Sequence, residues 1–225
     1  DSVSAPSVPG SGGGSNPDAN NWQPRAGSGG GVIRIEASGA VTIHGTVTAN
    51  GTGVTAGQHA AGGAGGAIHV TCDTFGGSSN GLVSVNGGDG YLNNLSGGGG
   101  GGRLAVGYRV LAAEHAVRFS AAPAAVEYAS ADTTNRWMHA ARMGTLWLPD
   151  TALLPDGIAN GLFNQVSLVI SGVTAWAAGS LAVSDSSFTF AESGFRVTVS
   201  NDLVIGSGGA VGLGAGSLAA YAAPR

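Results

Sequence analysis

Three times the chain passes from glycine directly into an alternating apolar segment: Gly31-Val-Ile-Arg-Ile-Glu-Ala37, Gly66-Ala-Ile-His-Val-Thr-Cys72 and Gly102-Arg-Leu-Ala-Val-Gly-Tyr108. The apolar positions recur at steps of 35 and 36 residues, so Ile33, Ile68 and Leu104 correspond to one another. A second segment repeats in the same register, because residues 46–51 match residues 82–87. Alternation with a period of two is typical of half-buried strands, and a repeat of this length indicates stacked units.

Each repeat holds three short alternating segments, at 32–37, 40–45 and 46–51, which cannot bury their apolar side chains alone. The sequence therefore predicts an all-β fold, a parallel β-solenoid in which each coil covers the next. Alternation assigns side chains to the two faces of the strands. The predicted inward set is Ile33, Ile35, Ile43, Val47 and Ala49, and the predicted outward set is Arg34, Glu36, Thr42, His44 and Thr48.

Asn50 and Asn86 occupy equivalent positions, and each precedes a glycine. Asn-Gly favours left-handed backbone at a sharp turn. Stacking of the coils would place the two amides one above the other, which predicts an asparagine ladder at a corner. The alternative interpretation is two exposed turn residues.

A glycine-rich excursion precedes each repeat, and the longest is the run of six at 97–102. Glycine accounts for 42 of 225 residues, yet 43% of residues are hydrophobic and only 10% are charged, a balance that excludes a disordered linker protein. Gly97, Gly99 and Gly102 match a dinucleotide-binding pattern, but a strand follows where that site needs a helix. We interpret the excursions as close-packed returns, for which glycine permits left-handed backbone and close approach.

The repeat divides the chain into three parts: glycine-rich coils at 1–108, a glycine-free insert or irregular coil at 109–143, and further coils at 144–225. Within the insert, residues 132–143 are compatible with a short helix that Asp132 caps and Gly144 ends. Strands are then predicted at 144–148, 166–170, 180–183, 187–190, 195–199, 203–205 and 210–213.

Charge and composition exclude several classes of function. The net charge is −4, lysine is absent and no basic run occurs, so nucleic acid is not a predicted partner. The sequence has no apolar window of 18 residues, so no membrane span is predicted. The single cysteine, Cys72, lies in an apolar run and is predicted to be a buried residue rather than a reactive thiol.

No constellation of residues predicts catalysis, a cofactor or a metal. Ser79 fits a nucleophile-elbow pattern, but strand-like residues follow it and a polar turn is the better interpretation. Polysaccharide-cleaving sites gather carboxylates with Arg or Lys on an outward strand face. Arg34 above His69 is the only hint of such a polar row. We therefore assign no catalytic, cofactor-binding or metal-binding residues and predict that the chain is not an enzyme.

The segments at 5–14, 29–37, 45–51 and 97–108 resemble the glycine-rich right-handed β-helix repeats of very large secreted bacterial surface proteins. The strand Gly144-Thr-Leu-Trp-Leu148 resembles one that follows such repeats. The resemblance implies a right-handed β-helix, an extracellular or cell-surface location, and an adhesin-like or fibre-like role. It implies no catalytic residues.

A β-solenoid has two open ends, each a row of unpaired strand edges, which natural proteins protect with lysine, proline or caps. The bland segment from Gly212 to Arg225 is not a polar cap. We expect a non-catalytic extracellular structural subunit that stacks on itself head to tail through these edges, or forms part of a longer surface stalk. The alternatives are a surface adhesin or glycan-binding module and, second, a polysaccharide-degrading β-helix enzyme.

Overall fold

The computed structural model describes residues 2–15, 25–54, 60–90, 97–124 and 141–214, and the backbone of one strand at 217–220. The described chain is all-β and forms three sheets, in which every strand pair is parallel. The helix predicted at 132–143 falls mainly on residues outside the described ones. In the part described, no helix is long and apolar enough to cross a membrane.

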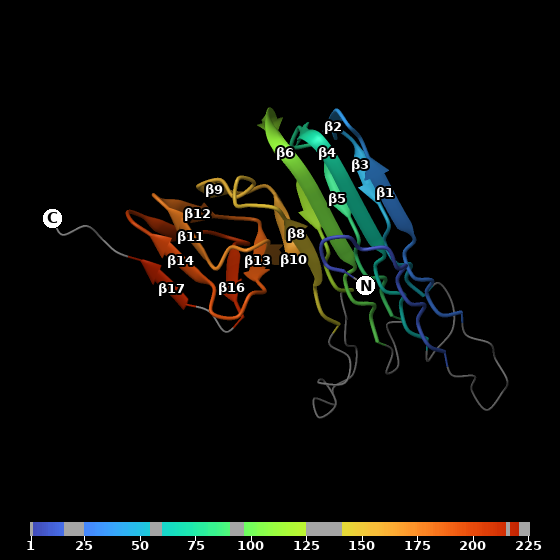
Figure 1. The fold of residues 1–225 in the computed structure, drawn as a ribbon. Helices are drawn as coiled ribbons and strands as arrows, with labels where there is room; N and C mark the ends of the chain where they lie inside the picture. Colours follow the sequence, from blue (N-terminus) through green and yellow to red (C-terminus); the bar gives the residue numbers. More distant parts are fainter. Residues whose placement is uncertain are drawn as a thin grey trace, which may run out of the picture.

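The strands of the first half pair one repeat above the next, as Figure 1 shows for β1, β4 and β6. Ile33 lies opposite Ile68, and Ile68 lies opposite Leu104, which confirms the register predicted from the repeat. Val47 likewise pairs with Val83. The strands of this half are β1 (Val32–Glu36), β2 (Ala40–Thr42), β3 (Thr46–Thr48), β4 (Ala67–Gly77), β5 (Leu82–Ser84), β6 (Arg103–His115) and β7 (Arg118–Ser120). β6 and β7 thus extend regular structure into the glycine-free segment as far as residue 120.

The second half repeats with a shorter period. Phe188 pairs with Val166, 22 residues away, and Val197 pairs with Trp176, 21 residues away. Successive strands enter three different sheets in turn. They are β8 (Gly144–Leu148), β9 (Gly157–Ile158), β10 (Phe163–Ile170), β11 (Ala175–Ala178), β12 (Leu181–Val183), β13 (Ser187–Phe190), β14 (Arg196–Val199), β15 (Leu203–Ile205), β16 (Ala210–Leu213) and β17 (Ser217–Ala220). Five of the seven strands predicted here agree within one residue at each end, while β10 begins three residues before the predicted 166–170; β9 and β11 were missed.

β10 joins the two halves. Its first residues pair with β7 and its later residues pair with β8, with a register shift at Gln165, whose φ is 50°. The eleven-stranded sheet therefore curls over on itself like half of a barrel (Figure 1).

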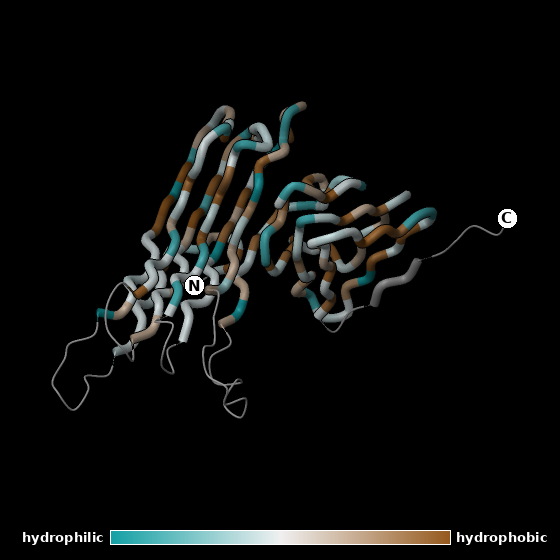
Figure 2. The backbone as a smooth tube through the Cα atoms, turned by 180° about the vertical axis from the view of Figure 1, so that it is seen from behind, coloured by the Kyte–Doolittle hydropathy of each residue, from teal (hydrophilic) through white to brown (hydrophobic). Residues whose placement is uncertain are grey.

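The interior is a column of aromatic side chains that crosses the junction. Phe75, Phe119, Phe163 and Phe188 follow one another with ring centroids 5.4 to 6.3 Å apart. Figure 2 shows hydrophobic residues alternating with polar ones along the strands. The predicted facing is confirmed: Ile43 and Ala49 are buried, Ile33, Ile35 and Val47 pack against the core, and the predicted outward residues are exposed.

The glycine-rich excursions form a hydrogen-bonded layer of their own. Consecutive N–H groups of residues 61–66 donate in rotation to three neighbouring segments, at 11–14, 97–100 and 49–52. Each neighbour accepts at every third residue, the repeat of a polyproline II helix, and not at every second residue as in a strand. A Cβ on Gly65 or Gly102 would collide with a backbone oxygen of a neighbouring segment. Close approach therefore explains the six glycines at 97–102; none of them has the left-handed backbone that was also expected.

The asparagine corner is a ladder, but a mixed one. Asn50 Oδ1 accepts hydrogen bonds from Ser84 Oγ and from the backbone N–H of Asn86, both at 2.7 Å. Asn86 Oδ1 repeats the pattern one coil on, accepting from Ser120 Oγ at 2.6 Å and from Ala122 N at 2.9 Å. The left-handed backbone predicted at Asn50 and Asn86 is wrong, because each side chain bonds to the next coil rather than closing a tight local turn.

The glycine layer predicts a position-dependent effect of one methyl group. Gly102→Ala should lower the free energy of unfolding by about 3 kcal/mol or more, because the new Cβ meets the carbonyl oxygen of Gly66. Gly31 occupies the equivalent position in the first coil and has open space around it, so Gly31→Ala is the matched control. Urea denaturation measures both; equal stability of the two variants would contradict the close-packed layer.

The corner ladder predicts a second loss of stability. Asn86→Ala leaves the Ser120 hydroxyl and the Ala122 N–H without their acceptor, at a cost of about 1–3 kcal/mol. Asn201→Ala is the control, since Asn201 is exposed and should change stability by less than about 0.5 kcal/mol. Thermal denaturation of both variants checks this, and an unchanged Asn86→Ala would show that the ladder contributes nothing.

Candidate functional site

The two ends of the stack carry free strand edges. At one end, β1 and β2 pair with β4 alone, and β3 pairs with β5 alone. At the other end, β15, β16 and β17 pair only with β12, β13 and β14. No second partner for these six strands occurs in the described part of the chain. Each end therefore presents three parallel edges with unpaired backbone groups.

The apolar rows of the core run out to both ends without being covered. Ile33 is only half-buried, although its partner one coil inward, Ile68, is 1% exposed. At the other end Val211 is half-buried, while its partner Phe188 is 1% exposed. Val204 on β15 is 56% exposed. The side chains that would contact a further coil are thus already in place at both ends.

The terminal strands lack the devices that usually block edge pairing. None of β1, β2, β3, β15, β16 or β17 contains proline or lysine. The charges of β1, Arg34 and Glu36, point outward and pair with each other at 2.6 Å, away from the apolar row. An inward-pointing charge is the usual deterrent to a new strand, and here the inward positions are isoleucines.

The predicted polar row on the outer face exists, with Arg34 opposite His69. His69 shares a 3.1 Å hydrogen bond with Thr71. The hydrogen bond from Arg34 lowers the pKa of Glu36, while burial and then the Arg34 charge lower the pKa of His69. The row contains a single, ion-paired carboxylate, which is unlike the carboxylate groups of polysaccharide-cleaving sites. Within the described residues, no three His, Cys, Asp or Glu side chains converge as a metal site would require.

Two further polar contacts connect successive coils. Arg109 donates to both oxygens of Asp73, at 2.6 and 3.0 Å, and thereby lowers the pKa of that carboxyl. Tyr108 donates to Asp150 at 2.6 Å; burial first, and this bond second, raise the pKa of Tyr108, so its hydroxyl stays protonated. Both pairs act as structural ties and show no sign of chemistry.

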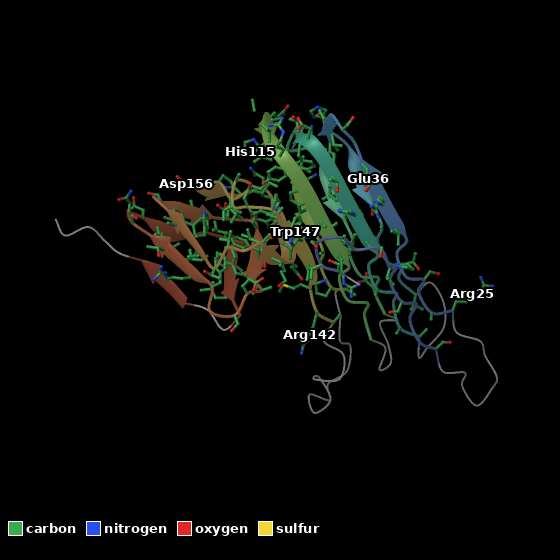
Figure 3. All side chains as sticks on the ribbon, viewed as in Figure 1. Arg25, Glu36, His115, Arg142, Trp147 and Asp156 are labelled. Atoms are coloured by element: carbon green, nitrogen blue, oxygen red, sulfur yellow. The ribbon has the colours of Figure 1, made fainter. Side chains whose placement is uncertain are left out.

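A groove of about 380 Å³ opens where the two halves meet. Its walls are the end of β6 and the segments on either side of β9, and Figure 3 labels His115 and Asp156 in these two regions. Most of the lining is apolar, but Glu114, His115, Arg118 and Asn160 contribute to it. Ser79 lines it too, from the polar turn predicted around it, in which Gly81 N donates to Ser78 O.

Arg118 is the unusual group of this groove. Its Nε–H is buried and has no hydrogen-bond acceptor, a deficit that costs about 1–3 kcal/mol for a typical group. The sequence analysis missed the groove, because its residues lie in unrepeated segments that only the meeting of two coil lengths brings together. Asn160, with a φ of 54°, was read only as loop punctuation.

Cys72 is buried as predicted, at 7% exposure. Burial raises the pKa of its thiol, and only the thiolate is nucleophilic. In the folded protein at pH 8, Cys72 should therefore react with a thiol reagent at least about tenfold more slowly than in urea. A Thr71→Cys/Cys72→Ala variant moves the thiol to the exposed side of the same strand and is the control, which should react quickly when folded. Equal rates for the two folded proteins would contradict the burial of Cys72.

Comparison of the chain with known proteins returned no match, whether to a family model, to a curated protein or to a solved structure.

Proposed function

We propose that the chain is a non-catalytic extracellular structural protein, a right-handed parallel β-helix whose stack of coils continues at both ends. The observation that carries this proposal is the pair of open ends, where free parallel edges coincide with half-buried apolar rows. A further coil would pair the edges and bury the rows at the same time.

The order of the strands supports the β-helix. In the second half each group of three consecutive strands supplies one member to each of three parallel ladders, so β9, β10 and β11 lie above β12, β13 and β14. The first half repeats in the same sense with longer coils. Right-handedness follows the general preference of parallel crossover connections.

Head-to-tail self-association is the simplest way to cover both ends. The end formed by β15, β16 and β17 and the end formed by β1, β2 and β3 are different surfaces, so one end of a copy can cover the opposite end of the next. Such a heterologous contact does not close and produces a filament. The extracellular location rests on the resemblance of the glycine-rich repeats to those of secreted bacterial surface proteins.

A glycan-binding or adhesin role is the second candidate, and the groove at the junction of the two halves favours it. The two roles are compatible, because the groove lies between the ends and not on them.

The filament proposal predicts a strong effect of one inward charge. Val211→Lys places an ammonium in the apolar row of β16 and should abolish assembly, because covering the end would then bury an unpaired charge. Ala210→Lys puts the same charge on the exposed side of the same strand and should leave assembly unchanged. Electron microscopy and sedimentation velocity of all three proteins provide the measurement.

Discrete monomers of the unmodified protein at high concentration would overturn self-association. Filaments that persist in Val211→Lys would show that the association uses some surface other than the open end. Circular dichroism of each variant establishes that the fold is intact.

A further inference from the structure

The groove at the junction is a built site, distinct from the open ends. It lies between the last residues of β6 and the segments on either side of β9, and its volume of about 380 Å³ is that of a small-molecule site. Leu153, Pro155 and Leu162 give it an apolar surface. A flat, partly apolar ligand such as a sugar ring can pack its C–H face on such a surface.

Arg118 provides a cation that no described carboxylate neutralises. Its guanidinium remains charged at all relevant pH values. Glu114 lines the same groove, yet the two side chains form no ion pair. The Nε–H that lacks an acceptor is one arm of the planar donor fork that fits a carboxylate with two parallel hydrogen bonds. A bound carboxylate would satisfy both the charge and the orphaned donor.

The remaining polar groups of the groove suit hydroxyls. His115 Nδ1 lies 2.7 Å from the carbonyl oxygen of Ala112, and because a carbonyl only accepts, Nδ1 carries the proton. Nε2 of the neutral ring is then an acceptor. The carboxylate of Glu114 also accepts, and the side chain of Asn160 can both donate and accept.

From this combination we infer that the groove binds a sugar acid, a single ring that carries one carboxylate and several hydroxyls. A neutral sugar would leave the Nε–H of Arg118 unpaired. A phosphate would bring up to two negative charges close to Glu114. A simple carboxylate such as acetate would use Arg118 but none of the hydroxyl partners.

The test is isothermal titration calorimetry with three probes of matched size or charge: glucuronate, glucose and acetate. Glucuronate should bind at least about tenfold more tightly than either of the others, because only it engages both Arg118 and the hydroxyl partners. Arg118→Gln should lose this advantage. Arg109→Gln removes an arginine that is already paired with Asp73 and should leave glucuronate binding unchanged.

A measurement on the unmodified protein guards against a variant that fails to fold. The Nε–H signal of Arg118 in a ¹⁵N–¹H spectrum should shift on addition of glucuronate and stay unchanged with glucose. Equal affinity for glucuronate and acetate would overturn the assignment to a sugar acid, as would glucuronate binding that Arg109→Gln and Arg118→Gln weaken alike. Neither outcome bears on filament formation, so this inference and the proposed function fail or hold independently.

Discussion

Parallel pairing at a constant register fixes the distance between successive coils at about one strand spacing, 4.8 Å, and every other feature must fit that distance. Ile33, Ile68 and Leu104 lie in one row because of it. The stacked phenylalanines meet it with rings roughly 6 Å apart. Where the chain returns between strands there is room for backbone alone, and for this reason the returns are glycine.

The repeat was predictable because it is written in both residue type and spacing. The register of β1, β4 and β6, the facing of their side chains and the position of the asparagine corner all follow from it. The second half was predictable strand by strand from short alternating runs, although β9 and β11 are too short or too alanine-rich to produce that signal.

What the sequence could not predict depends on contacts between unlike segments. The three-way hydrogen bonding of residues 61–66 needs the paths of three other segments, which composition does not specify. The groove around Arg118 exists because coils of about 35 residues give way to coils of about 22, which leaves the end of β6 standing beside the segment around β9. No repeat signals such a junction, and of its residues only Ser79 attracted notice, as a turn.

The glycine layer also separates hydrogen bonding from secondary structure. Its segments are neither helix nor strand, yet each N–H from residue 61 to residue 66 has a backbone acceptor. Circular dichroism would count this layer as irregular, whereas amide exchange would find it as protected as a sheet. A protein of this kind is therefore more ordered than its secondary-structure content suggests, and its order lies in the segments that have no side chains.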